Sequence, residues 1–192
     1  MKKWGVLVAV AALVAVAASG TARSEIGVGV IWDGDGITPN MVLPIKMASG
    51  LTIEPVLGFS SVQEFGYYGA EVPSENDKPR TTQIRFGARV EKAMTATAAT
   101  PLIGAEFMAH MNSFSNQQVG GEDLKSRLDF AFGVYVGGSA KLADGVEIVG
   151  TWGPMVGMTA KQKAGDNELT DSETSFGTRA TFALRFWLWG VK

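Results

Sequence analysis

The sequence contains no cysteine, a single histidine and no large excess of either charge. The absence of cysteine excludes a disulfide-linked scaffold, a thiolate metal site and a lipid-modified N-terminal cysteine. Because His110 is the only histidine, a histidine-rich metal site is excluded as well. The formal net charge of −2 gives no electrostatic basis for binding nucleic acid. The sequence therefore predicts no metal, no cofactor and no nucleic-acid partner.

Long apolar runs are also absent after the first residues of the chain. Two lysines precede an apolar run over 4–18, and small residues follow it, which is the order of a secretory signal peptide. An uncleaved membrane anchor is the alternative, but the run is short for a transmembrane span. We therefore predict that residues 1–22 are a cleaved signal peptide, with cleavage near Gly20 or Ala22. No later apolar run approaches about 18 residues, so no transmembrane helix is predicted.

The rest of the chain alternates apolar and polar residues with a period of two, which is typical of half-buried β-strands. The 24 glycines show no collagen-like repeat and suit tight turns or closely packed strands. Eight segments have this alternation, and they cover 25–32, 41–48, 51–59, 83–91, 103–111, 127–137, 146–159 and 178–189. Pro44, Pro55 and Pro154 lie within them, where each removes a backbone donor, so we predict bulges or local breaks there.

Two kinds of connection alternate strictly between these segments. One set is short or built of small residues, and it covers 49–50, 95–100 and 143–145. The other set is more polar, and all but its first member are longer; it covers 33–40, 66–80, 116–123 and 165–173. An up-and-down barrel with one trimmed rim and one elaborated rim has this alternation.

The ionisable residues within the segments lie mostly on the glycine-rich face of the alternation. Of those that we count as mid-strand, five are acids and five are bases, and His110 shares their face. Such a balance indicates pairing in a confined space, because a solvated face needs no balance. We predict that these residues form an interior charge network, and they are Glu25, Lys46, Glu54, Arg85, Arg89, Glu91, Glu106, His110, Glu147, Arg179 and Arg185.

The opposite face is almost entirely Val, Ile, Leu, Phe, Met and Ala, which fits contact with lipid. A transmembrane strand needs about 9–11 tilted residues, and a sheet in lipid must close so that its backbone groups are all paired. Eight strands leave an interior just wide enough for side chains to fill. The prediction is therefore an all-β fold, an eight-stranded antiparallel up-and-down transmembrane β-barrel over residues 25–189.

The last segment gives two more specific expectations. Glu25 lies on the first strand, which the last must pair with, so we expect it to be the counter-charge of Arg185. Trp187 and Trp189 share the parity of the interior arginines, so they either cap the interior or mark a bulge that turns them outward. Other aromatic residues lie at segment ends beside the longer loops, where an interfacial girdle belongs: Trp32, Phe65, Tyr67, Tyr68, Phe114 and Phe176.

Together these features resemble the small eight-stranded outer-membrane β-barrel proteins of Gram-negative bacteria. The resemblance extends from the signal peptide to the aromatic last strand, although no motif identifies a subfamily. It implies a multi-pass barrel in the outer membrane with both termini in the periplasm, in contact with lipopolysaccharide and other outer-membrane lipids. It also implies insertion by the barrel-assembly machinery, which reads a final aromatic residue. Here Gly190 to Lys192 follow Trp189, so that signal is present but displaced.

The functional prediction is a non-enzymatic barrel with a structural or surface-interaction role in the cell envelope, whose protein partners stay unidentified. A narrow pore for small solutes is the first alternative, and a lipid A-modifying enzyme is the second. Lipid A deacylases of this architecture carry a His-x-Ser-Asn element with a downstream Glu. In HMNSFSN (110–116), Ser115 and Asn116 match its end, but Ser113 replaces the histidine and Glu122 is too close. Because a serine without its base is inert at neutral pH, no catalytic residue is predicted.

Overall fold

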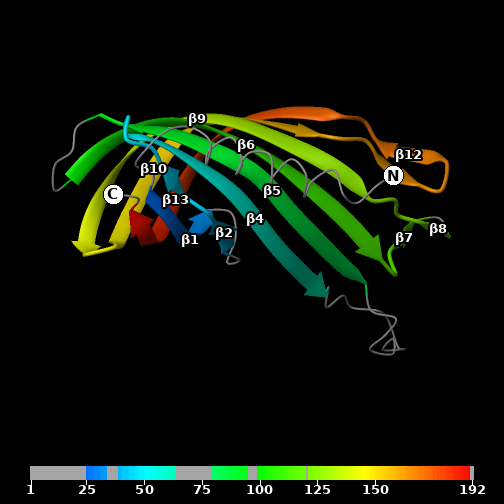
Figure 1. Ribbon diagram of the computed structural model, residues 1–192. Helices are drawn as coiled ribbons and strands as arrows, with labels where there is room; N and C mark the ends of the chain where they lie inside the picture. The colour runs from blue at the N-terminus through cyan, green and yellow to red at the C-terminus, as the bar shows by residue number, and fades with distance from the viewer. Residues whose placement is uncertain (1–24, 34–38, 64–78, 95–98, 120, 191–192) are drawn as a thin grey trace.

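The computed structural model describes residues 25–33, 39–63, 79–94, 99–119 and 121–190 (Figure 1). The predicted signal peptide lies outside these residues, as do Phe65, Tyr67 and Tyr68 of the predicted aromatic girdle. No helix in the described ranges has the length and hydropathy to cross a membrane. The main sheet consists of β1 (Glu25–Asp33), β2 (Asn40–Val42), β3 (Ile45–Lys46), β4 (Leu51–Gln63), β5 (Arg80–Ala93), β6 (Ala99–Ser115), β9 (Arg127–Ala143), β10 (Val146–Thr159) and β13 (Glu173–Gly190).

Apart from β2 and β3, which both lie between β1 and β4, each strand of this sheet pairs antiparallel with the next along the chain, and β13 pairs back with β1. The nine strands of the sheet count as eight around the barrel, because β2 and β3 are two pieces of one chain run that both pair with β1 and β4. The predicted eight-stranded antiparallel up-and-down barrel is therefore confirmed (Figure 1).

The prolines account for the irregular points of the ladder. Pro44 separates β2 from β3, and Pro55 on β4 lies beside this break, where its carbonyl accepts a hydrogen bond of 3.1 Å from the Leu43 amide. Pro55 has no amide proton to donate, but the strand opposite it is already interrupted. Its presence therefore costs few backbone hydrogen bonds of the sheet. At Pro154 the register of β10 against β9 passes from Trp152–Val136 directly to Met155–Gly133.

The two rims differ as the connections predicted. At one rim Gly50 and Gly145 adopt φ values of 76° and 77°, the left-handed conformation that tight turns between β3 and β4 and between β9 and β10 require. At the other rim, β6, β9 and β13 are 17, 17 and 18 residues long, whereas β1 has only 9. Since Asp33 pairs with Thr181, residues 173–180 of β13 extend beyond the end of β1.

Two small hairpins continue this longer rim, within or beside the predicted connections 116–123 and 165–173. They are β7 (Gln118–Val119) with β8 (Glu122–Asp123), and β11 (Gln162–Ala164) with β12 (Asn167–Thr170). A bridge between Leu124 and Ala164 joins the two hairpins, and the Lys125 amide donates 2.8 Å to the Lys163 carbonyl. They lie at one end of the sheet, on the right of the view (Figure 1).

The β11–β12 hairpin is held by exposed ion pairs, so we expect it to loosen in acid. Glu168 lies 2.8 Å from Lys161 and 3.3 Å from Lys163, and the hydrogen bonds from these lysines lower the pKa of Glu168. A lowered carboxyl pKa stabilises the folded hairpin above the ordinary glutamate pKa, and this contribution disappears as the pH falls through the lowered value. Amide exchange, corrected for its intrinsic pH dependence, should rise in residues 162–170 between about pH 6 and pH 3. An unchanged corrected rate would contradict the expectation, and a small rise is expected because the pairs are solvent-exposed.

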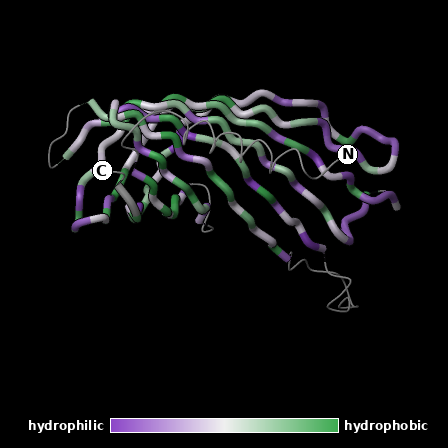
Figure 2. Tube along the Cα trace, in the orientation of Figure 1, coloured by the Kyte–Doolittle hydropathy of each residue, from purple (hydrophilic) through white to green (hydrophobic). Residues whose placement is uncertain are grey.

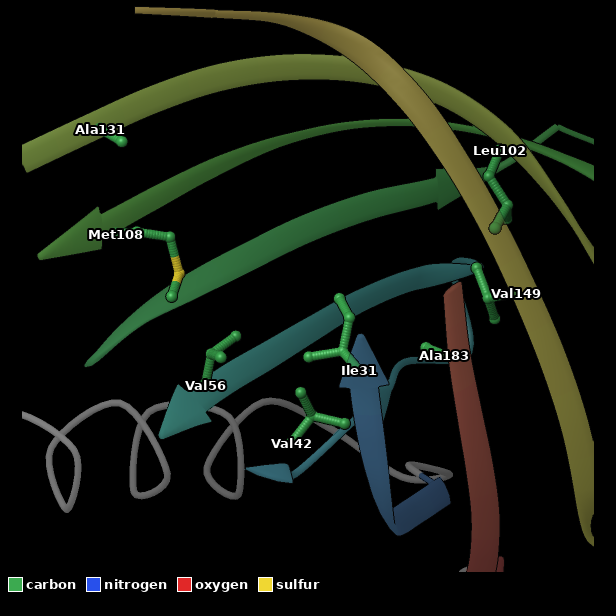
Figure 3. Packing of buried hydrophobic residues seen from close by; sticks show 8 residues of the cluster. All are labelled: Ile31, Val42, Val56, Leu102, Met108, Ala131, Val149 and Ala183. Carbon is green, nitrogen blue, oxygen red and sulfur yellow. The ribbon is translucent and has the colours of Figure 1, made fainter. Parts of the chain in front are cut away.

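Side chains alternate between the inside and the outside of the barrel. Apolar side chains from seven strands point into the enclosed space (Figure 3), and they are Ile31, Val42, Val56, Leu102, Met108, Ala131, Val149 and Ala183. On the outside, Val134 and Val136 in the middle of β9 are 58% and 56% exposed. The hydropathy of the strands is accordingly mixed, with green and purple positions alternating along each (Figure 2).

Candidate functional site

The centre of the interior holds one arginine among several carboxylates. Arg185 on β13 donates 2.8 Å from Nε to Glu54 Oε1 and 2.6 Å from Nη1 to Glu91 Oε1. Its Nη1 also lies 3.7 Å from Glu147 Oε2. The side chains of Arg185, Glu54 and Glu91 are at most 2% exposed, so the attraction acts in a region of low dielectric constant.

Arg89 on β5 extends this cluster along the barrel. Its Nη1 lies 3.2 Å from Glu54 Oε2, and its Nε lies 3.5 Å from Glu106 Oε2. Nη2 donates 3.1 Å to the hydroxyl of Thr151, which in turn lies 2.6 Å from the hydroxyl of Thr181. Residues from β4, β5, β6, β10 and β13 therefore meet at this guanidinium group.

The series of ion pairs then continues towards the rim with the hairpins. Arg179 Nη1 donates 2.8 Å to Glu106 Oε1, and its Nη2 contacts Asp33. Asp33 also lies 3.5 Å from Arg85 Nη1 and accepts a hydrogen bond of 3.0 Å from Asn40. Beyond Arg85, side-chain hydrogen bonds and an ion pair run on in a chain through Gln83, Asn112, Asp129 and Arg127.

The structure brings together eight of the predicted interior residues, which are Glu54, Arg85, Arg89, Glu91, Glu106, Glu147, Arg179 and Arg185. His110 lies between Arg85 and Asp129 in the sheet register and is half-buried. Glu25 and Lys46 pair with each other in register at the other rim, outside this chain of contacts.

The expectation that Glu25 neutralises Arg185 is wrong. The strand register sets Arg185 opposite Gly29, whereas Glu25 is opposite Gly190 and is exposed. The staggered pairing of β1 with β13 separates the two side chains along the barrel. Arg185 instead uses carboxylates from β4 and β5, which reach it across the interior.

Several members of the network were not predicted. Asp33 continues the interior parity of β1 by one residue beyond the predicted segment, and Asp129 has the interior parity of β9. Extending the first predicted strand by one residue would have found Asp33, and counting every ionisable residue on the polar face of 127–137 would have found Asp129. The threonine hydroxyls and Tyr135 carry no charge, and no sequence signal separates them from other small or aromatic interior residues.

Trp187 closes the interior at the rim where the barrel begins and ends. Its Nε1 donates 3.2 Å to Glu147 Oε2, and the Lys46 ammonium lies 5.6 Å from the centre of its ring. The β1–β13 register shifts between Ile26 and Gly27, which sets Trp189 opposite Ile26. Trp187 therefore caps the interior, a bulge follows it, and the side chain of Trp189 lies outside the described part of the chain.

Tyr135 lies flat across Gly104, which gives a testable packing prediction. The Arg89 guanidinium lies 4.6 Å from the centre of the Tyr135 ring, and a Cβ on Gly104 would lie 2.4 Å from the ring. We expect Gly104→Val to destabilise the barrel by about 1–3 kcal/mol through overpacking. Urea unfolding in detergent measures this cost. Gly138→Val is the matched control, because there the nearest heavy atom is 3.7 Å away, and an equal loss in both variants would contradict the prediction.

The residues considered for lipid A chemistry do not come together in one site. His110 faces the interior, whereas Ser113, an odd number of residues later on β6, belongs to the opposite face. The Ser113 hydroxyl accepts a hydrogen bond of 3.2 Å from the Ser126 hydroxyl. Within the described ranges, no group of three or more His, Cys, Asp or Glu side chains is placed to hold a metal ion.

The chain is thus a closed eight-stranded barrel with an ion-paired interior. Two solved structures are similar to it, each with a TM-score of 0.46. Neisserial surface protein A is 12% identical and matches 86% of this chain and 95% of its own; a major outer membrane protein from Thermus thermophilus is 14% identical and matches 85% and 98%. No family model and no curated protein matches the sequence.

Proposed function

We propose that this chain is an integral outer-membrane protein with a structural or surface-interaction role, whose interior is filled by side chains. The carrying observation is an apolar outer surface on a closed barrel. Large exposed hydrophobic side chains occur on every strand around the barrel, and they are Ile26, Val28, Met41, Leu57, Phe59, Val90, Ile103, Phe107, Met111, Leu128, Phe132, Val134, Val136, Trp152, Met158, Phe182, Phe186 and Leu188. Soluble monomers rarely expose so continuous an apolar surface.

The positions of the charges support the same proposal. Arg185 and Glu54 are almost completely buried inside the barrel, while their neighbours on the same strands, such as Phe186 and Leu57, face outward. A water-soluble barrel of this size places its charges outside and its apolar side chains inside. Lipid reverses that preference, because only an apolar outer face avoids desolvating charge.

The buried ion pairs favour a closed interior over a pore. Arg185 bonds to Glu54 and Glu91 across the interior, at 2.8 and 2.6 Å, so these side chains occupy space that a water path along the barrel would need. Leaving either partner buried without the other is costly. This observation supports the non-conducting role, and it is the reason that a pore is the lesser candidate.

The two rims support an orientation in the membrane. We place the rim with the start of β1, the end of β13 and the short turns at Gly50 and Gly145 in the periplasm. The β7–β8 and β11–β12 hairpins are then outside, since outer-membrane barrels have short periplasmic turns and longer outer loops. The hairpins would then contact lipopolysaccharide, the barrel wall would contact phospholipid, and β13 would be read by the barrel-assembly machinery during insertion.

Three measurements test this proposal. We expect the refolded protein to migrate differently in SDS gels when boiled and unboiled, to be silent in a planar bilayer, and to leave the lipid A mass spectrum of cells unchanged. An unchanged band on boiling would overturn the membrane barrel. Reproducible single-channel steps would replace the structural role with a pore, and modified lipid A that depends on the protein would replace it with an enzyme.

A further inference from the structure

A charged cavity lies at the rim where β1 begins and β13 ends. Its volume is about 150 Å³. Two lysines line it, Lys46 on β3 and Lys141 on β9, together with two acids, Glu25 on β1 and Glu147 on β10. The side chain of Trp187 on β13 lines it as well. Because the formal charges of these four ionisable side chains cancel, the cavity suits a ligand that carries both signs of charge.

The two lysines are not paired with the acids that the sheet places opposite them. Lys46 is opposite Glu25 and Lys141 is opposite Glu147 in the strand register, where unlike charges ordinarily attract. Among the described residues, however, neither lysine has a carboxylate within ion-pair distance. The Lys46 ammonium lies 5.6 Å from the centre of the Trp187 ring, and Glu147 accepts a hydrogen bond from Trp187 Nε1. Two ammonium groups and the Glu25 carboxylate are therefore available to a ligand.

The cavity also reaches the apolar outer surface of the barrel. Leu188, which is 49% exposed, is part of its lining. So is Val146, which lies opposite the outward-facing Phe186 in the register of β10 and β13. Residues directly opposite one another share a face of the sheet, so the cavity meets the lower edge of the apolar belt. A molecule with a charged end and apolar chains fits both parts of this lining at once.

We propose that this cavity binds the headgroup of a phospholipid that carries a phosphate and a primary ammonium group. The phosphate accepts hydrogen bonds from Lys46 and Lys141, the ligand ammonium donates to Glu25, and the acyl chains run along the outer face from Leu188. Basic pockets at the membrane surface bind lipid headgroups in this way, and tryptophan belongs at the same level. The proposal rests on the membrane role proposed above, because only a barrel in a bilayer presents this rim to phospholipid.

A headgroup with a quaternary ammonium fits the cavity less well. It has no N–H group to donate to Glu25. Aromatic rings hold such groups by cation–π attraction, but the Lys46 ammonium already lies over the ring of Trp187. The cavity should therefore distinguish ethanolamine from choline as well as from an uncharged glycerol headgroup.

Native mass spectrometry of the refolded full barrel tests this preference. The protein in detergent is titrated with phosphatidylethanolamine, phosphatidylcholine or phosphatidylglycerol of identical acyl chains, and the retained lipid is counted. We expect phosphatidylethanolamine to bind roughly tenfold more tightly than either of the others, since each of them lacks one charge-assisted hydrogen bond. Equal retention of the three lipids would overturn the proposal. Glycerophosphoethanolamine has the same headgroup without acyl chains; if it bound as tightly as the whole lipid, a soluble zwitterion would replace the lipid as occupant.

Substitutions at the rim locate the site. Lys141→Gln removes one donor and should weaken the binding of phosphatidylethanolamine roughly tenfold. Glu25→Gln should remove the preference over phosphatidylglycerol and leave the affinity for phosphatidylglycerol unchanged. Lys92→Gln is the matched control, because Lys92 is an exposed lysine at the same rim that donates to the Ser49 carbonyl and does not line the cavity. Equal losses in Lys141→Gln and Lys92→Gln would overturn the site in favour of a general attraction between the rim and lipid.

A boiled and an unboiled sample of the same preparation keep the two proposals apart. A barrel that shifts on boiling but retains no phosphatidylethanolamine would contradict the headgroup site alone. A band that does not shift would contradict the membrane barrel itself.

Discussion

Arg185→Ala is expected to lower the free energy of unfolding by about 3–5 kcal/mol, the loss that follows when one partner of a buried ion pair is removed. The guanidinium group is the shared counter-charge of Glu54 and Glu91, with Nε and Nη2 both donating to Glu54 at 2.8 and 3.1 Å. Without it, buried carboxylates would face one another across the interior with Arg89 as the nearest remaining cation. Mutual repulsion and lost hydrogen bonds therefore act in the same direction.

Urea unfolding in detergent, followed by the unboiled band on a gel, measures this loss. Lys163→Ala is the matched control, since Lys163 also pairs with a glutamate, at 3.3 Å, but with side chains 44% and 45% exposed. Exposed pairs contribute only about 0–1 kcal/mol. Equal losses in the two variants would mean that the interior is hydrated like the surface.

A double variant identifies the cause of the loss. If repulsion among the carboxylates dominates, the double variant Arg185→Ala, Glu91→Gln should be more stable than Arg185→Ala alone. The second substitution removes one of the carboxylates that has lost its arginine. Coupled residues of one network deviate from additivity by about 0.5–3 kcal/mol. Strictly additive losses would instead assign the effect to the lost packing of the arginine side chain.

The fold was readable from the sequence because each barrel strand has one apolar face that points outward and one face towards the interior, and this arrangement imposes a period of two. The strand predictions failed where a strand no longer has one outward face and one interior face. Residues 173–177 of β13 were predicted outside the strand segments, yet they pair with β10 beyond the end of β1. In β12 all four residues are exposed, so the hairpin is held by backbone hydrogen bonds and Lys–Glu pairs that leave no apolar period.

The interior residues were predictable by parity, but their partners were not. Parity places a side chain inside the barrel, whereas the partner depends on the stagger between strands, which is a property of the whole closed sheet. Arg185 illustrates this, because its partner Glu54 is 131 residues away and lies across the interior. Glu25, which is on the adjacent strand, is displaced along the barrel by the β1–β13 register. Local sequence therefore specified most of the interior charges and left the pairing open.

A charge on the outer face tests whether that face contacts lipid. Val134 lies near the middle of β9, is 58% exposed and faces outward. Val134→Arg should destabilise the barrel folded in lipid vesicles by about 2–4 kcal/mol, the cost of an arginine near the bilayer midplane. If the same face met water, an exposed arginine would fit there with a change within about 0.5 kcal/mol. The two environments therefore predict clearly different results for one substitution.

Urea unfolding from vesicles, monitored by tryptophan fluorescence, measures the effect. Val119→Arg on β7 is the matched control, because Val119 is 47% exposed on an outer hairpin that the proposed orientation leaves in water. Its expected change is within about 0.5 kcal/mol, as for other surface substitutions. A depth series adds a second criterion, since Leu188→Arg near the rim should cost about 0–1 kcal/mol against the larger value for Val134. Equal, small changes at all three positions would remove the membrane from the explanation of the apolar face, and the barrel would then have to bury that face against other protein.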